Sequence, residues 1–578
     1  MWRVNILLSA VLLFSGCLYA QSGQELESIM AVLGTDAPED IEPDDVERLS
    51  SYMSSPIDLN NASCSELISS ELFSSYQIAS LEDYIARHGN IMSFAELAAV
   101  DGFSSGMVNR LKPFIRIGNS SFLHVSNRNS YDISLRSSLK LLHSGISYVP
   151  SWHYGLKCEA DLSEWLSLGI SGSRPYDALA IYPSVISGNL AFSFRKPAIR
   201  IIIGDYKARF GQGLALWHGM SFGSFSSPSS FMKKPSGISP SCTFSGNSSA
   251  SGVAVDYVAG NIFISVLLDF PDLKKKSDLS LVREMVPAMN VTWRSSRGHC
   301  SFTHVQNCLM TGYGVRIPEM KSSIDAAFCL RGVNLYGEIM YDWVRGIVPF
   351  VAGVGFNAGE CVNNAFLVKY MDGDLSMAAL CSEYLSADKR HNAVISLESV
   401  LYQIAKTEDA DKSLQLKGSL LWKFQPFPGF DVKFRLSERF RSWGDMFRTD
   451  LRVDMGYSCC NFHCRCRFNM LKCKETGYMG YLEAGYVNGG FSLYLRQGVF
   501  FIDEWADRIY VSERDVPGSY NVPALYGRGE WTSLVGSYRV GKLMRIYLRF
   551  SYFAYPFMPE KNRKPGKAEL KMQLVFKF

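Results

Sequence analysis

The stretch "MRIYLRFSYFAY", residues 544–555, decides the fold, because apolar and polar side chains alternate along it. In an extended strand, successive side chains point to opposite faces. One face carries Ile546, Leu548, Phe550 and Tyr552, and the other carries Arg545, Tyr547, Arg549 and Ser551. The final residues, "KAELKMQLVFKF" (567–578), repeat the pattern and end on Phe578. Strands of this kind must bury one face, against either a protein core or a membrane.

The same two-residue rhythm recurs from about residue 130 to the end, in runs separated by Gly, Asn, Pro and Ser. Examples are "YDISLRSSLKLL" (131–142), "SGVAVDYVAG" (251–260), "KSLQLKGSLLWKF" (412–424) and "GYLEAGYVNGGFSLYLRQG" (480–498). A closed barrel pairs every strand edge, as a lipid environment requires. We therefore predict a mainly β fold, a large antiparallel transmembrane β-barrel of about 18–24 strands over residues 118–578. The alternative is a large soluble β-sandwich or solenoid.

The first residues have the features of an export signal. Arg3 precedes an apolar run from residue 6 to 13, and small residues precede Gln21. This predicts a signal peptide over residues 1–20, with acylation of Cys17 in a lipoprotein as the alternative. The rest of the chain contains no apolar stretch of about twenty residues. We expect a bacterial outer-membrane location, contact with outer-membrane lipid, and recognition by the barrel-assembly machinery, whose C-terminal signal the Phe578 strand resembles.

Charge is distributed unevenly along the chain. Residues 21–117 hold 16 acidic and 5 basic residues, a net charge of −11, whereas residues 118–578 hold 39 acidic and 53 basic residues, a net charge of +14. Many of these bases fall on the polar face of strands, and would line the lumen: Arg136, Lys140, Lys417, Lys433, Arg435, Arg465, Arg467, Arg496, Arg545 and Arg549. An open lumen of this kind would favour anions. In the alternative, opposite charges pair in a plugged interior, to which residues 207–249 contribute.

The N-terminal part is predicted to be a small all-α domain in two sections. Residues 21–55 form an acidic helical lead. Residues 56–117 contain an internal repeat at an offset of 30, in which Phe73 returns as Phe103. Each unit opens with S-x-x-E, the capping-box pattern, and continues as two short helices. We expect the two helix pairs to pack about a pseudo-twofold axis.

Residues 57–115 resemble the tandem helix-hairpin-helix module of ComEA-like competence DNA receptors. The matching motifs are "DLNNAS" (58–63), "RHG" (87–89), "FAELAAVDGF" (94–103) and "LKPFI" (111–115). Together with the acidic lead and "GDYKARFGQGLALWHG" (204–219), the whole chain is similar to an outer-membrane barrel family of Bacteroidetes-type bacteria. The resemblance implies a periplasmic helix-hairpin-helix domain placed before the barrel.

In that family, each hairpin presents Gly–apolar–Gly, so that backbone N–H groups can approach a phosphate. Here the second hairpin keeps one glycine, and the first hairpin, residues 72–74, has none. Residues 56–117 carry 7 acidic and 4 basic residues, whereas duplex binding depends on cations. The candidate nucleic-acid contacts are Gly102, Phe103, Ser104, Arg110, Lys112 and Arg116. The alternative is a docking or spacer domain in which these bases are solvated.

Signals of catalysis or of metal binding are weak. In "CCNFHCRC" (459–466), alternation puts Cys460, Cys464 and Cys466 on an apolar face and His463 beside bases on the other face, which disfavours a cation. Thirteen cysteines remain after the signal, and Cys300 and Cys308 flank a possible hairpin as a plausible disulfide. The nine histidines are scattered and no zinc, P-loop or nucleophile-elbow motif occurs. We predict no cofactor, no metal and no enzymatic activity.

Two functions follow from these patterns. The first is a non-enzymatic outer-membrane barrel that presents a periplasmic docking module to a protein partner. The second is a conduit or receptor for DNA or another polyanion, as in competence-like DNA uptake, through the module and a cationic lumen.

Overall fold

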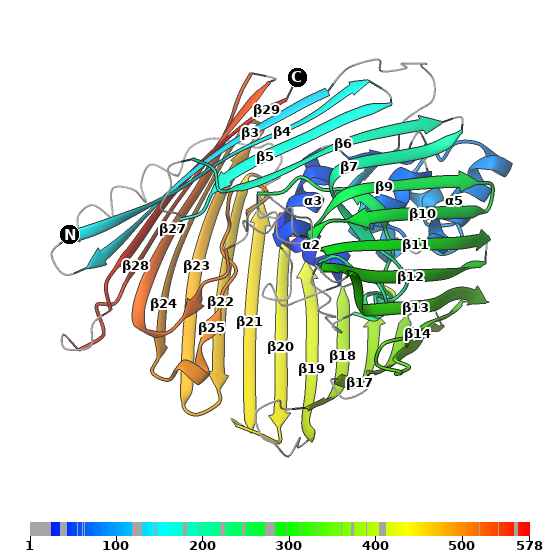
Figure 1. Ribbon diagram of the computed structural model, residues 1–578. Coiled ribbons are helices and arrows are strands. Elements are labelled where there is room, and N and C mark those ends of the chain that lie inside the picture. The colour runs from blue at the N-terminus through cyan, green and yellow to red at the C-terminus, as the bar shows by residue number, and fades with distance from the viewer. Residues whose placement is uncertain are drawn as a thin grey trace.

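Alternation of apolar and polar residues folds most of the chain into one closed antiparallel barrel, with helices inside the ring of strands (Figure 1). The computed structural model describes residues 25–577 except for 35–42, 55, 61, 63, 104, 118–129, 145–146, 164, 177–181, 196, 220–224, 226, 245–248, 272–283, 296, 312–313, 331, 360, 372–374, 389, 404–411, 445, 520, 542 and 560–563. Among the described residues, no helix is long and apolar enough to cross a membrane.

Within the described residues, 24 strands make the wall, in agreement with the predicted fold class and strand number. They are β3 (Ser130–Ser144), β4 (Ser147–Ser163), β5 (Leu166–Arg174), β6 (Val185–Arg195), β7 (Ala198–Arg209), β9 (Ala250–Ala259), β10 (Ile262–Asp269), β11 (Glu284–Ser295), β12 (Gly298–Thr311), β13 (Gly314–Leu330), β14 (Val333–Asp342), β15 (Phe350–Ala358), β16 (Val362–Tyr370), β17 (Leu375–Leu385), β18 (His391–Gln403), β19 (Lys412–Phe427), β20 (Phe430–Arg441), β21 (Phe447–Cys459), β22 (Phe462–Lys472), β23 (Thr476–Asn488), β24 (Phe491–Ile502), β27 (Gly527–Val540), β28 (Met544–Ala554) and β29 (Lys567–Lys577). The ring closes where β29 pairs with β3.

The remaining elements lie outside the wall sequence. The helices are α2 (Glu25–Leu33), α3 (Pro43–Ser54), α4 (Cys64–Ser69), α5 (Ser75–His88), α6 (Phe94–Leu97) and α7 (Ser105–Leu111), with short 3-10 turns η3 (Pro228–Ser230) and η5 (Trp505–Asp507). The short strands are β1 (Ile57–Asp58), β2 (Ile115–Arg116), β8 (Gly237–Pro240), β25 (Ile509–Tyr510) and β26 (Ala524–Leu525).

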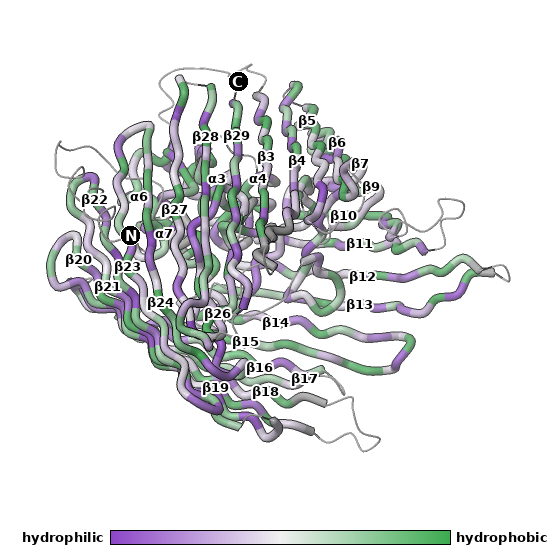
Figure 2. The backbone as a smooth tube through the Cα atoms, turned by 90° about the vertical axis from the view of Figure 1, so that its left-hand side faces the viewer, coloured by the Kyte–Doolittle hydropathy of each residue, from purple (hydrophilic) through white to green (hydrophobic). Residues whose placement is uncertain are grey.

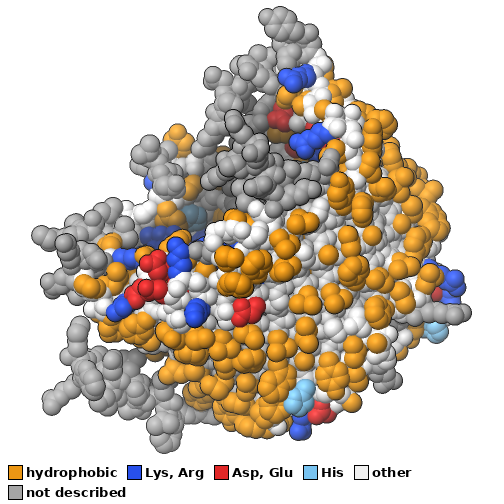
Figure 3. Space-filling model, turned by 90° about the horizontal axis from the view of Figure 1, so that it is seen from below, with side chains coloured by type: hydrophobic (Ala, Val, Ile, Leu, Met, Phe, Trp, Pro, Cys, Tyr) orange, Lys and Arg blue, Asp and Glu red, His pale blue; other side chains and the backbone are white. Residues whose placement is uncertain are grey.

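The two faces of the wall follow the alternation in the sequence. On β28, Leu548, Phe550 and Tyr552 are about 40 % exposed (41 %, 39 % and 38 %), whereas Arg549 and Ser551 on the other face are 0 % and 1 % exposed. Figure 2 shows the same alternation of hydrophilic and hydrophobic residues along the strands. Figure 3 shows hydrophobic side chains covering the part of the wall that faces the viewer, with charged groups mostly toward its edges. An exposed apolar face of this extent is stable only against hydrocarbon, so the barrel spans a membrane.

The two ends of the barrel differ in their connections. At one end, successive strands are joined by two to five residues, for example 260–261 and 489–490; we call this the short-turn end. At the opposite end, the long-loop end, the connections include residues 210–249 and 503–526. Outer-membrane barrels have short periplasmic turns and longer extracellular loops. Closed antiparallel barrels of this construction belong to the bacterial outer membrane, which is the location of this chain.

Strand β7 leaves the wall partway along its length. Residues up to Tyr206 pair with β9, and residues 206–209 pair with the short strand β8. Gly204, with φ +104°, permits the change of direction, since a Cβ there would lie 2.2 Å from the carbonyl oxygen of Gly188. Residues 205–210 are buried on both faces, so this end of β7 runs inside the wall.

The helical domain, residues 25–117 as described, forms its own apolar core. Residues related by the offset of 30 are buried together: Leu67 and Leu97, Phe73 and Phe103, Ile78 and Val108, Leu81 and Leu111. The rings of Phe73 and Phe103 meet at a centroid distance of 6.1 Å, and β1 pairs in parallel with β2. Ser74 and Gln77 form a capping box at α5, and Ser93 caps α6 by accepting from the Glu96 N–H.

Candidate functional site

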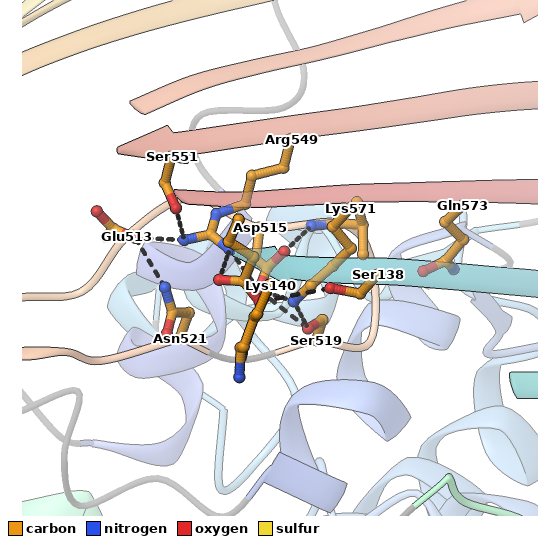
Figure 4. A network of polar contacts seen from close by, with 12 residues as sticks. Ser138, Lys140, Glu513, Asp515, Ser519, Asn521, Arg549, Ser551, Lys571 and Gln573 are labelled. Carbon is orange, nitrogen blue, oxygen red and sulfur yellow. Dashed lines mark hydrogen bonds and ion pairs between the residues drawn. The ribbon is translucent and has the colours of Figure 1, made fainter. Parts of the chain in front are cut away.

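The candidate functional site is the lumen, where polar faces of the wall meet segments of the same chain. Figure 4 shows one such contact, between β28, β29 and residues 503–526, which we call the inner loop. Arg549 is fully buried and binds Glu513 of the inner loop and Glu569 of β29, the latter at 2.9 Å. Lys571 donates to Asp515 at 2.6 Å. Three carboxylates and two bases therefore form one ion-pair network out of water.

A second contact holds the same loop against β23 and β24. Arg496 donates through Nε and Nη2 to one oxygen of Glu483, at 2.9 and 2.7 Å, and Arg514 of the inner loop donates in the same way to the other oxygen. Arg136 on β3 donates to the carbonyl of Pro517 at 2.8 Å. Burial alone would raise the pKa of Asp515, but Lys571 and Arg549 outweigh it and hold that pKa at about 2. The inner loop is therefore held by ion pairs of both polarities: its acids meet bases of the wall, and its Arg514 meets an acid of the wall.

The helical domain is attached to the interior through its first hairpin. Glu71 at the hairpin tip binds Arg209 of β7 at 2.5 Å and Arg48 of α3 at 3.0 Å. The carbonyl of Leu72 accepts a hydrogen bond from Lys234 at 3.0 Å. On α4, which precedes the hairpin tip, the Cys64 thiol accepts from Arg294 on the inner face of β11 at 3.3 Å. The hairpin therefore presents a carboxylate and a carbonyl to cations.

Burial shifts the pKa of three groups at this junction. Burial by itself would raise the pKa of Asp45, but Arg48 and Arg209 outweigh it, and the pKa is lowered to about 2. Burial lowers the pKa of Lys233 to about 7, and repulsion by Lys369 adds to the effect. Burial also lowers the pKa of Lys234 to about 8. The junction therefore contains one acid, Asp45, that stays charged at neutral pH, and two lysines that titrate near neutral pH.

The segment after β7 is bound by a carboxylate of the wall. Glu338 on β14 accepts backbone hydrogen bonds from Gln212 at 2.7 Å, Leu214 at 3.0 Å and Ala215 at 3.3 Å. A cavity of about 60 Å³ lies between this segment, the helical domain and the wall. Its lining includes Ile68, Arg200, Asp256 and His299.

The structure places all ten predicted luminal bases on the inner face, but it brings them into different surroundings. Arg467, Arg496 and Arg549 bind buried acids. Arg136 binds Gln573 and Pro517, Lys140 lies 3.9 Å from Glu569, and Arg545 donates to Ser537. The other four lie on β19, β20 and β22: Lys417, Lys433, Arg435 and Arg465. The role of these residues in anion passage remains a prediction.

The predicted nucleic-acid contacts are dispersed over the second hairpin. Gly102 has φ +82°, its carbonyl accepts from Gln77, and a Cβ there would lie 2.6 Å from the Tyr76 ring. Phe103 is buried in the domain core. Ser104 lies outside the described residues.

The three predicted bases beyond the second hairpin have separate neighbours. Lys112 is exposed near the Phe94 ring, and Arg116 is exposed with Asp58 at 3.4 Å. Arg110 is half-buried and lies close enough to Lys234 to repel its charge. DNA contact by these residues remains a prediction.

Two clusters contain the residue types of a hydrolase active site, but their geometry differs from that of a catalytic triad. On the inner wall, Asp325 accepts from Ser301 and pairs with His299 at 3.0 Å, so the hydroxyl meets the carboxylate and not the imidazole. On the outer face, His304 Nδ1 lies 2.9 Å from the Ser322 hydroxyl, which also accepts from an indole N–H. Among the described residues, no carboxylate hydrogen-bonds the other nitrogen of His304. A Ser–His–acid relay is therefore not assembled in either place.

The structure corrects two sequence-based predictions about cysteines. Cys300 and Cys308 lie on the single strand β12, about 26 Å apart along it, and both are free thiols, so they do not form the expected disulfide. Cys460 lies in the turn after β21 with φ +54°, and so does not share a strand face with Cys464. Within the described residues, no three His, Cys, Asp or Glu side chains converge as metal ligands.

The sequence analysis missed the acids that organise the lumen. Three of these acids lie on the same inner face of the strands as the bases: Glu483, Asp454 and Glu569. The other two, Glu513 and Asp515, lie in the inner loop. The local signal was present in "SERDVP" (512–517), a charged run between short apolar strands. Glu71 and Arg209 could not be paired from sequence, since they are separated by 138 residues.

No family model matches the chain, and no curated protein matches it. Solved structures that are similar include the P pilus usher PapC translocation pore, at 10 % identity and TM-score 0.39, covering 78 % of this chain and 99 % of that one. The siderophore receptor PirA from Pseudomonas aeruginosa is similar at 7 % identity and TM-score 0.43, covering 78 % and 81 %. OccK11 (OpdR) from Pseudomonas aeruginosa is similar at 8 % identity and TM-score 0.29, covering 78 % and 96 %. At these scores the likenesses carry no argument about function.

Proposed function

We propose that this chain is a non-enzymatic outer-membrane barrel, closed at its short-turn end by its own helical domain, which also docks a partner on the periplasmic side. The observation that carries the proposal is the ion cluster of Glu71, Arg48 and Arg209, which ties the first hairpin to the inside of the wall. The domain is predicted to be a helix-hairpin-helix module, and the partner is predicted to be a periplasmic protein. The short-turn end is taken as periplasmic because outer-membrane barrels turn tightly on that side.

The nature of the junction supports a closure that can be released. Its bonds are charge-assisted and few, and the hairpin meets Arg209 and Lys234 through polar groups. Polar interfaces of this kind separate more readily than apolar cores, because both sides can be rehydrated. A partner that offers another cation to Glu71 would compete with Arg209 directly.

The surface that we propose for the partner is an exposed part of the helical domain. His88, Gly89 and Met92 are exposed, and Met92 is 62 % exposed. This region lies between α5 and α6, in the "RHG" motif and the residues that follow it. The barrel-assembly machinery remains a predicted partner through β29, and Phe578 itself lies outside the described residues.

Conductance in planar bilayers tests the closure. The wild-type barrel is expected to conduct little, and E71K is expected to open long-lived channels, since a lysine in place of Glu71 would repel Arg48 and Arg209. The matched control is D83K, because Asp83 has only a surface ion pair with Arg87 within α5. Wild-type conductance equal to that of E71K would contradict closure by the helical domain.

The second candidate function is a receptor or conduit for DNA or another polyanion. The exposure of Lys112 and Arg116 favours it, whereas the engagement of both hairpins within the chain opposes it. Retardation of duplex DNA by the full chain in detergent tests this candidate. K112Q/R116Q should abolish a specific effect, and affinity should fall steeply with salt. Equal retardation by wild type and variant would exclude the module as the DNA site.

A further inference from the structure

A row of three bases crosses the inner face of the wall on neighbouring strands. Lys417 on β19 lies directly opposite Arg439 on β20, and Arg439 lies directly opposite Arg448 on β21. Like charges placed opposite each other in a sheet destabilise it. Three bases in one row therefore indicate that these residues have a role other than stabilising the sheet.

A second pair lies on the same face, four residues along the strands. Arg435 on β20 is directly opposite Arg452 on β21. At about 3.3 Å per residue, the two arginine pairs are separated by about 13 Å along the strands. Arg441, the last residue of β20, extends the group toward the long-loop end and is held by Gln415 at 2.8 Å. All of these arginines are half-buried, so they face the lumen without being sealed from solvent.

The acids nearby leave the group with excess positive charge. Asp454 is engaged by Arg452 at 2.6 Å and Arg467 at 2.5 Å. Asp450 lies between the two pairs on β21, and its Oδ1 is buried without a hydrogen-bond partner among the described residues. Glu398 lies opposite Lys417.

One nitrogen of the guanidinium at the centre of the row is not satisfied by the described residues. The Nε of Arg439 is buried and has no hydrogen-bond partner among the described residues. Besides its burial, Arg439 experiences the charges of Arg441, Arg448 and Arg508, all of its own sign. A buried donor of this kind calls for an acceptor that the described part of the chain does not supply.

We propose that this group is a binding site for a soluble ligand that carries two or more phosphate groups. A phosphate has close to two negative charges and three acceptor oxygens, so one phosphate matches one arginine pair. Five of the six bases are arginines, whose planar forks bind phosphate oxygens in pairs. The separation of the two pairs requires at least two anionic groups. The site does not involve the helical domain, so it can be tested independently of the closure proposed above.

Calorimetric titration of the full chain in phosphate-free detergent with inorganic tripolyphosphate tests the site. Wild type is expected to bind, with affinity that weakens as salt rises. R439Q/R448Q should weaken binding at least ten-fold, and D450N should strengthen it several-fold, since it removes the acid between the pairs. D450N keeps every proposed contact, so a gain cannot come from misfolding. The absence of binding by wild type at low salt would overturn the proposal.

The control variant is R545Q. Arg545 also faces an arginine, Arg539, across two strands on the inner face, but Arg539 is exposed at the short-turn rim. The proposal expects R545Q to bind tripolyphosphate like wild type. An equal loss in R545Q would show that charge is spread over the lumen and that no site exists. Equal affinity for citrate would overturn the selectivity for phosphate.

Discussion

Two stretches of the same inner wall surround their arginines with different charges. On β28 and β29, Arg549 is sealed from water and meets acids of both the wall and the inner loop. On β20 and β21, Arg439 and Arg448 face each other, and the Nε of Arg439 lacks a partner among the described residues. The difference teaches that inner-face charge serves two purposes in one barrel. Where an insert supplies acids the charge fixes structure, and where none is supplied the charge is left for a ligand.

The largest expected effect is the loss of Arg549. R549A removes the base that binds the buried carboxylates of Glu513 and Glu569, which should cost about 3–5 kcal/mol of unfolding free energy. Urea titration of the barrel in lipid vesicles, followed by the mobility shift between folded and heated samples, measures the loss. S551A on the same face is the control. A cost below about 1 kcal/mol would mean that water already reaches Glu513 and Glu569, and the contrast between the two stretches would fail.

The next effect checks which face is outside. L548R places a charge on the apolar face of β28 and should cost about 2–4 kcal/mol if that residue lies near the middle of the bilayer. Y547R, the neighbouring residue on the inner face, is the control and should cost much less. The same urea titration provides the measurement. Equal costs for the two variants would remove the distinction between lipid face and lumen.

A pH dependence is expected from Lys233. Its pKa is about 7 in the folded protein and 10.5 in the unfolded chain, so the unfolded state binds more protons between these values. Stability should therefore rise with pH from 7 toward 10.5, by about 2 kcal/mol between pH 7 and 9. K233M lacks the group, so the difference in unfolding free energy between wild type and K233M should change by that amount. A difference that does not vary with pH would show that Lys233 is solvated.

The smallest expected effect concerns the second stretch, where Arg439 and Arg448 face each other. R439Q/R448Q removes a like-charge pair, and should stabilise the barrel by about 0.2–1 kcal/mol in phosphate-free buffer. Tripolyphosphate should raise the stability of wild type and leave that of the variant unchanged. Thermal unfolding with and without the anion measures both. Destabilisation of the variant without ligand would indicate that these arginines are structural, like Arg549.

The sequence was sufficient to predict the barrel wall, but it was insufficient to predict the contacts inside the lumen. Alternation in "MRIYLRFSYFAY" identifies the lipid face of β28, because period two is a local property of extended chain. The same rule put Arg549 and Lys417 on one inner surface. It could not tell that Arg549 is neutralised and that Lys417 faces another base. Those outcomes depend on strand register and on which loop folds inward, and both are set by contacts between distant residues.

The repeat at an offset of 30 is the converse case. It marked Phe73 and Phe103 as equivalent positions, and in the structure their rings meet at a centroid distance of 6.1 Å in one core. It gave no indication that Glu71, between those helices, is bound by Arg209.

The most direct test of the central claim, that the helical domain lies inside the barrel, is photocrosslinking in intact membranes. A photoreactive phenylalanine analogue replaces Cys64 on α4, whose thiol lies 3.3 Å from Arg294 Nη1 on β11. We predict a crosslink within one chain to the β11 peptide that contains Arg294, identified by mass spectrometry, and none from the same analogue at Asn109, which is exposed. A domain that crosslinks from position 64 only to other proteins, or not to the wall at all, would contradict the claim.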